Sequence, residues 1–296
     1  MEWDEGFDIR NTPSELFATR LQQAIDVLGL MGVRVKRSSR PHEALRHLKT
    51  FQNDGAFDPK IDAAKRLAEE FVLIVSAAYR CRRLGTPFSL DKMQRMLDDP
   101  LVPSGQQSPG RDVQFELLLA AMFHLGGAEV VTGEPDLRIT YREETIGVAA
   151  KRITSLNSST LSTRVREAVR QINGSRLRGW IALNLDTRFE SLQRVDDEVL
   201  LRVASEEFDA VRREVGDKRW DRECVMGLIL HGRAAEWTPR RGGEAPRYKL
   251  AWFQRWLLLV DDAATEPAIR DFGDSLFGAM ESSVREIWRE DYTWRM

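Results

Sequence analysis

Two neighbouring segments, residues 136–140 and 146–151, alternate between apolar and polar side chains. Successive side chains of a β-strand point to opposite faces, so each segment predicts a strand with one apolar face. The apolar positions of the two segments are Leu137, Ile139, Ile146, Val148 and Ala150. If these positions pack on one core, Asp136 and Lys151 lie together on the opposite face. A four-residue turn from Arg142 to Thr145 would place that acid and that lysine directly across from each other.

A helix is predicted immediately before these strands, from Asp112 to Leu125, and Gly126-Gly127 ends it. Its apolar stripe consists of Phe115, Leu118, Leu119, Met122 and Phe123. Glu116 interrupts this stripe. A carboxylate beside a core costs free energy unless it has a partner, and a metal ion or Lys151 would be such a partner.

Three features follow one another in a recognisable order: a helix that carries Glu116, the residues Glu134-Pro135-Asp136 at the start of one strand, and a lysine at the end of the next strand. This order resembles the metal-dependent nuclease superfamily that is named after its PD-(D/E)XK motif. The resemblance covers about residues 110–186. It implies an α/β (α+β) domain with a restriction-endonuclease-like mixed central sheet flanked by helices. It also implies hydrolysis of phosphodiester bonds, most simply of DNA, with Mg²⁺ or Mn²⁺ as cofactor.

The resemblance assigns roles residue by residue. The metal ligands that it implies are Glu116, Asp136, the backbone carbonyl of Ala150 and, as an extra ligand, Glu134. Lys151 matches the catalytic lysine, which supports the attacking water and stabilises the transition state. Gln171, on the next predicted helix, matches a glutamine that many members of the superfamily direct at the site.

One position departs from the motif, because Ala149 stands where the superfamily has an acid two residues before the lysine. Glu144 cannot replace that acid, since its parity in the strand is wrong. Glu143 has the right parity but lies roughly 20 Å along the strand. Two explanations stay open. The residue was changed from Glu to Ala to trap an inactive enzyme, or the chain is a natural degenerate member that uses Glu116 and Glu134.

Basic residues follow the motif. From Lys151 to Trp180 there are seven basic residues against one acid, Glu167. The predicted nucleic-acid-binding residues are Arg152, Arg164, Arg166, Arg170, Arg176 and Arg178. Contacts with phosphates supply most nucleic-acid affinity, so this stretch favours binding over an ordinary solvated helix. A further basic turn is expected at residues 240–243.

The first hundred residues read as helices, with no segment that alternates like a strand. Pro, Gly and Ser crowd between residues 99 and 110, which predicts a domain boundary. We therefore expect a helical domain at residues 1–104, recognising a partner protein or DNA, and a nuclease-like domain at residues 105–296.

Composition sets wider limits. The chain has 44 Lys and Arg against 46 Asp and Glu, so net charge does not decide for or against nucleic acid. Two distant cysteines, Cys81 and Cys224, fit a reducing cytoplasm rather than a disulfide framework. Four scattered histidines lack zinc spacing. No secretion signal and no membrane-spanning run is apparent, so a cytoplasmic location without membrane contact is expected.

Three interpretations follow. The first is a metal-dependent endonuclease, impaired at Ala149, of the kind that the resemblance associates with bacterial restriction and anti-phage defence. A homodimer is expected for cutting two strands. The alternative is a catalytically degenerate nuclease fold that binds nucleic acid or a partner protein. The third is an unrelated interaction module, which would be favoured if Glu116, Asp136 and Lys151 failed to converge.

Overall fold

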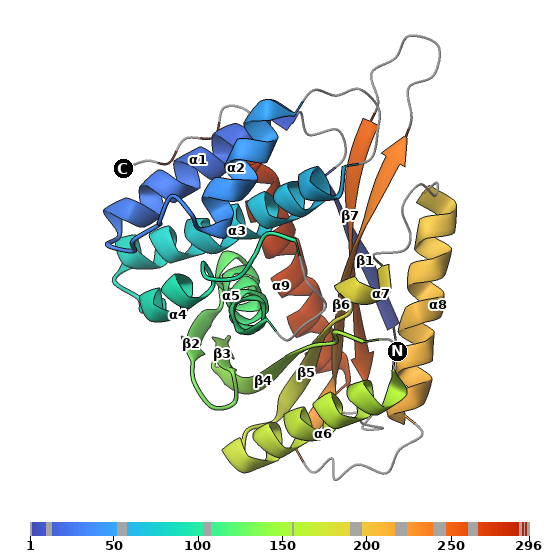
Figure 1. Cartoon of the computed structure of the whole chain (residues 1–296). Helices are drawn as coiled ribbons and strands as arrows, with labels where there is room; N and C mark the ends of the chain where they lie inside the picture. The colour runs from blue at the N-terminus through green and yellow to red at the C-terminus, as the bar shows by residue number, and fades with distance from the viewer. Residues whose placement is uncertain are drawn as a thin grey trace.

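A computed structural model provides the fold of the 296-residue chain. It describes residues 2–9, 14–51, 58–102, 108–155, 157–189, 197–216, 224–238, 247–259, 266–289, 292 and 294. The protein is mixed α/β, with one sheet and helices on both of its faces (Figure 1). The mixed α/β class predicted from the sequence is confirmed.

Seven strands form the sheet in the order β1-β7-β6-β5-β4-β3-β2. They are β1 (Glu2–Ile9), β2 (Glu129–Thr132), β3 (Leu137–Tyr141), β4 (Glu144–Arg152), β5 (Gly179–Asn184), β6 (Val225–Thr238) and β7 (Arg247–Leu258). The central strands β4, β5 and β6 are parallel, whereas the neighbours on both sides are antiparallel. The sheet is therefore mixed.

Nine helices lie in the described parts of the chain. They are α1 (Ser14–Leu30), α2 (Arg40–Thr50), α3 (Pro59–Leu84), α4 (Leu90–Arg95), α5 (Pro109–Leu125), α6 (Ser158–Ser175), α7 (Asp186–Phe189), α8 (Asp197–Gly216) and α9 (Glu266–Ile287). Local signals set the ends of α3: the Asp58 side chain accepts a hydrogen bond from the Lys60 N–H, and Gly85 ends the helix at φ 70°.

Two hydrophobic cores cover the two faces of the sheet. On β5, Trp180 and Ala182 join the core under α1, α3, α5 and α9, whereas Ile181 and Leu183 join the core under α6 and α8. Val148 of β4 belongs to the first core. The predicted apolar face of the strand pair is confirmed, and the opposite face is also covered.

The hairpin between β3 and β4 differs from its predicted register. Tyr141 pairs with Glu144, so the turn contains two residues, Arg142 and Glu143, both with positive φ (46° and 73°). Two-residue turns with positive φ match the twist of antiparallel strands. The register therefore moves by two residues, which preserves the face of every side chain. Continued one residue beyond the Leu137–Val148 pair, it places Asp136 across from Ala149 instead of Lys151.

The segment 1–104 is not all-helical, which corrects the sequence-based expectation. Residues 2–9 form β1, an edge strand antiparallel to β7. The acidic sequence of residues 2–9 did not indicate a strand, although charged residues are common on edge strands. One hydrophobic core includes α1, α3, α5 and α9, so residues on both sides of the predicted boundary at 104 and 105 share it.

Three smaller expectations concern a basic turn, membrane-spanning helices and the cysteines. The predicted basic turn at residues 240–243 lies outside the described residues. Within the described part of the chain, no helix combines the length and apolar character needed to cross a bilayer. Cys81 and Cys224 are both free thiols.

Candidate functional site

The Asp136 carboxylate is the centre of the candidate site. Its Oδ2 accepts hydrogen bonds from the Ala150 backbone N–H at 2.8 Å and from the Lys151 ammonium at 2.9 Å. Its Oδ1 accepts from the Gln171 amide at 3.3 Å. The Lys151 ammonium also donates to the Ala150 carbonyl at 3.1 Å. Four of the predicted site residues thus meet where β3, β4 and α6 come together.

A glycine allows the chain to approach β4 at this point. Pro135 is buried, and a Cβ placed on Gly147 would lie 2.7 Å from its Cγ. Any larger residue at position 147 would push the proline away from the strand. Gly147 therefore helps to place Asp136, the residue after the proline, over the end of β4.

Glu116 lies on α5 and is largely buried, as predicted, but its partner is Lys92 of α4. The Lys92 ammonium contacts Glu116 Oε1, whereas Lys151, the predicted partner, pairs with Asp136. Burial raises the pKa of Glu116, and the hydrogen bond from Lys92 opposes that rise. Asp136 and Lys151 also shift the pKa of Glu116, by their charges, so Glu116 lies within electrostatic range of both.

Lys92 is the residue of this site that the sequence did not identify. It lies in the first turn of α4, whose Ser89 cap accepts from the Lys92 N–H. The available signal was indirect, since a buried Glu116 requires a cationic partner. Nothing local to α4 indicated that Lys92 would supply it.

Ala149, where the motif has an acid, is 0% exposed and packs in the core under α6 and α8. Glu134, the predicted extra ligand, is exposed, and its backbone carbonyl accepts hydrogen bonds from Arg138 at 2.9 and 3.0 Å. The predicted acidic set is therefore reduced to Asp136, which contacts Lys151, and Glu116, which contacts Lys92.

The donor atoms fit a hard divalent cation by type, with fewer carboxylates than a site that has an acid at position 149. Carboxylates and a backbone carbonyl are ligands that Mg²⁺ takes, together with water. However, no three His, Cys, Asp or Glu side chains gather in a metal-binding arrangement among the described residues. Glu116 and Asp136 each have a lysine partner, so the two acids and two lysines balance in charge.

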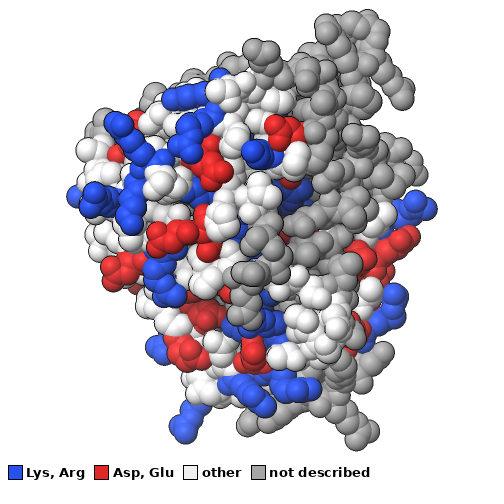
Figure 2. Space-filling view, in the orientation of Figure 1, with Lys and Arg blue, Asp and Glu red and all other residues white. Residues whose placement is uncertain are grey.

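The predicted basic residues divide into two groups. Arg152 pairs with Asp112 of α5 at 3.1 Å, and Arg164 pairs with Glu167 at 3.0 Å. The exposed members are Arg166, Arg170, Arg176 and Arg178, on α6 and the segment after it. Figure 2 shows basic side chains along the lower edge of the molecule, where Figure 1 places α6, and mixed charges elsewhere on this face.

A second charged cluster is formed by Asp186, which follows β5, by His231 and Arg233 of β6, and by Glu70 of α3. Arg233 contacts Asp186 through Nε at 3.2 Å and Glu70 through Nη1 at 2.6 Å. Burial opposes ionisation of Asp186, but the Arg233 guanidinium outweighs it and holds the pKa of Asp186 below its usual range. Burial lowers the pKa of His231 to about 4, against the charge of Asp186. This cluster is a buried ionic network.

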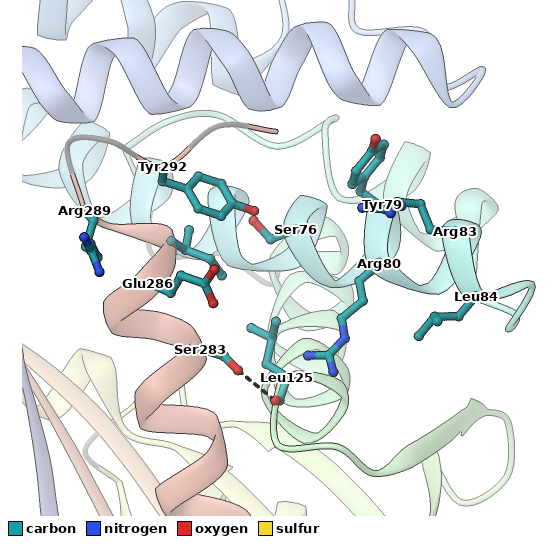
Figure 3. A pocket seen from close by; sticks show the side chains of 11 residues that line it. Ser76, Tyr79, Arg80, Arg83, Leu84, Leu125, Ser283, Glu286, Arg289 and Tyr292 are labelled. Atoms are coloured by element: carbon teal, nitrogen blue, oxygen red, sulfur yellow. Dashed lines mark hydrogen bonds between the residues drawn. The ribbon is translucent and has the colours of Figure 1, made fainter. Parts of the chain in front are cut away.

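A pocket of about 870 Å³ lies between α3, α5 and α9 (Figure 3). Arg80 of α3 points towards Leu125 and Ser283, and the Ser283 hydroxyl donates to the Leu125 carbonyl at 3.0 Å. Glu286 and Arg83 add opposite charges to its lining. None of the predicted site residues lines this pocket.

Comparison with known proteins found no match among family models, curated proteins or solved structures.

Proposed function

We propose that this protein is a metal-dependent nuclease with a restriction-endonuclease-like fold, which hydrolyses phosphodiester bonds of nucleic acid, in the first place DNA. The order α5-β2-β3-β4-α6-β5 supports the fold assignment. The observation that carries the functional proposal is the convergence of Asp136, Lys151 and Gln171.

Each residue has a role that its position allows. The Lys151 side chain is 13% exposed, and its ammonium is held between the Asp136 carboxylate and the Ala150 carbonyl. In this position it orients an attacking water and stabilises negative charge on the phosphate. Gln171 donates to the other oxygen of Asp136 and fixes the orientation of that carboxylate.

Glu116, Asp136 and the Ala150 carbonyl would hold the Mg²⁺ or Mn²⁺ ion. When bound, the ion would lower the pKa of a coordinated water and neutralise charge on the phosphate. Because Ala149 supplies no third carboxylate, we expect weak cation binding and slow cleavage. The chain would then need a higher cation concentration than a site with an acid at position 149.

The exposed arginines provide the nucleic-acid surface in this proposal. Arg170 lies one residue before Gln171 on α6, and Arg178 follows the helix. In this proposal, a phosphate backbone bound by these arginines lies along α6, the helix whose Gln171 contacts Asp136. Binding through phosphates alone is sequence-independent, so we expect little sequence preference from this surface.

A second function has its own supporting observation. Both acids of the site are paired with lysines, and Ala149 is packed in a core. This arrangement favours a protein that binds nucleic acid through α6 without cleaving it. Binding without hydrolysis would leave Lys151 and Asp136 as a structural ion pair.

Cleavage assays separate the two functions. Supercoiled plasmid, linear DNA and RNA are incubated with Mg²⁺ or Mn²⁺ and with the native chain, Lys151→Met or Asp136→Asn. Lys60→Met, an exposed lysine at the start of α3, is the matched control. The nuclease proposal requires that the native chain and the Lys60→Met control cleave nucleic acid. The cleavage rate of both site variants should be at least 100-fold lower. Retained binding to DNA without any cleavage would support the second function instead.

A further inference from the structure

Lys92 joins the helical part of the chain to the candidate site. It comes from α4, in the segment that the sequence assigned to partner or DNA recognition, and it contacts Glu116 of α5. The two side chains are 24% and 12% exposed, respectively. The contact is therefore a partly shielded ion pair, which water and salt screen less than a surface pair.

Several contacts fix α4 in the position that presents Lys92. Met93 and Met96 are fully buried in the core beneath α4. Gln94 exchanges two hydrogen bonds with the backbone of Arg34, at 3.1 and 3.2 Å, and so ties α4 to the segment after α1. Lys92 thus reaches Glu116 from a helix that is anchored to the N-terminal helices.

The charges at the site make Lys92 a competitor of a cation. Asp136 and Glu116 provide two negative charges, and Lys151 and Lys92 provide two positive ones. A divalent cation that binds Glu116 must displace an ammonium already in contact with the same carboxylate. It must also enter a cluster without net negative charge. Removal of one lysine would leave a net charge of −1 and a free carboxylate oxygen.

We infer that Lys92 occupies the place of the divalent cation at Glu116, so that α4 controls cation entry to the site. This inference deepens the proposed function, because it takes Glu116 as a cation ligand. Its consequence is that any partner or nucleic acid that moves α4 away from α5 increases cation affinity. The helical segment would then regulate the site without contributing a ligand.

Cation binding by the intact chain tests this inference. Mn²⁺ binding is measured by electron paramagnetic resonance of free Mn²⁺ and by calorimetry, without nucleic acid. Lys92→Met is expected to bind Mn²⁺ at least 10-fold more tightly than the native chain. Arg95→Met, an exposed residue of the same helix, should bind like the native chain. The gain should disappear in the Lys92→Met/Glu116→Gln double variant.

Lys92→Gln provides a second test, because it removes the charge and keeps a polar hydrogen-bond donor on a slightly shorter side chain. It should also bind Mn²⁺ more tightly, and thermal unfolding confirms that each variant is folded. Unchanged Mn²⁺ affinity in both folded Lys92 variants, or a gain that persists without Glu116, would overturn the inference. Tighter Mn²⁺ binding without cleavage of any nucleic acid would support the role of Lys92 and contradict the nuclease proposal alone.

Discussion

The Lys151 ammonium lies 2.9 Å from the Asp136 carboxylate, although the strand register, continued one residue beyond the Leu137–Val148 pair, places Ala149 across from Asp136. The contact is therefore diagonal across the β3–β4 pair, which long side chains can bridge. Ala149 occupies the position directly across, where a longer acid would be nearest to Asp136. This relationship explains why the alanine leaves the acid–lysine pair intact, although it offers no carboxylate to the proposed cation.

The Lys92–Glu116 pair should contribute to stability in a way that a thermodynamic cycle detects. Lys92→Met leaves a largely buried carboxylate without its partner, so we expect a loss of about 1–3 kcal/mol. Glu116→Gln removes the charge and should relieve most of this loss in the double variant. Urea unfolding of the four proteins measures the coupling. Additive effects would show that the two side chains do not interact.

His231 should make stability depend on pH. Its side chain is 0% exposed, and burial lowers its pKa from 6.5 to about 4. Below pH 6.5 the His231 side chain binds a proton in the unfolded chain but stays neutral in the folded chain. Its contribution to the free energy of unfolding is therefore fully present above pH 6.5 and is lost as the pH decreases towards 4. The loss is roughly 3 kcal/mol by linkage.

A variant isolates this contribution from the other acid-sensitive groups. His231→Gln should lose less stability than the native chain between pH 7 and pH 4.5, measured by urea unfolding at each pH. His47→Gln, a half-buried histidine beside Glu43, is the control and should follow the native curve. Parallel curves for the native chain and His231→Gln would contradict the assignment.

The arginines of the α6 surface should govern the salt dependence of nucleic-acid binding. For duplex DNA, each lost phosphate contact reduces the slope of log affinity against log salt by about 0.9. Arg170→Ala with Arg178→Ala should therefore reduce both affinity and slope. Arg80→Ala with Arg83→Ala, two exposed residues of α3, is the matched control. Equal slopes in the two double variants would place the binding surface elsewhere.

The turn between β3 and β4 should be improved by glycine. Glu143 has φ 73°, a conformation that costs a side chain about 1 kcal/mol and costs glycine nothing. Glu143→Gly should raise the free energy of unfolding by up to about 1 kcal/mol. Glu144→Gly, one residue later in β4, should lower it. A loss of stability in Glu143→Gly would show that the turn adopts another geometry.

The strand pair and the Asp136–Lys151 contact were predictable because they depend on local alternation. Leu137, Ile139 and Val148 pack on one core, and the parity of Asp136 and Lys151 follows from the same pattern. The predicted register of the two strands was wrong by two residues, which leaves that parity unchanged. The predicted contact between Asp136 and Lys151 is therefore present in the structure. The length of the turn was missed because neither Arg142 nor Glu143 is a residue that usually adopts positive φ.

Long-range relationships were not predictable from the sequence. Residues 2–9 pair with residues 250–257 of β7, and no local pattern in the acidic first segment indicates this pairing. Lys92 reaches Glu116 only because α4 packs beside α5. Both contacts are set by the packing of distant segments rather than by the periodicity of either one.

The most direct test of the account is a titration of plasmid cleavage with Mn²⁺, comparing the native chain with Ala149→Glu. The substitution buries an acid and should reduce stability, and Ala149→Gln controls for that loss. We expect the native chain to cleave the plasmid only at high Mn²⁺ concentration. Ala149→Glu should cleave it at an Mn²⁺ concentration that is at least 10-fold lower. We also expect Lys151→Met to abolish both activities. Failure of folded Ala149→Glu to cleave at any Mn²⁺ concentration, or cleavage that survives Lys151→Met, would contradict the account.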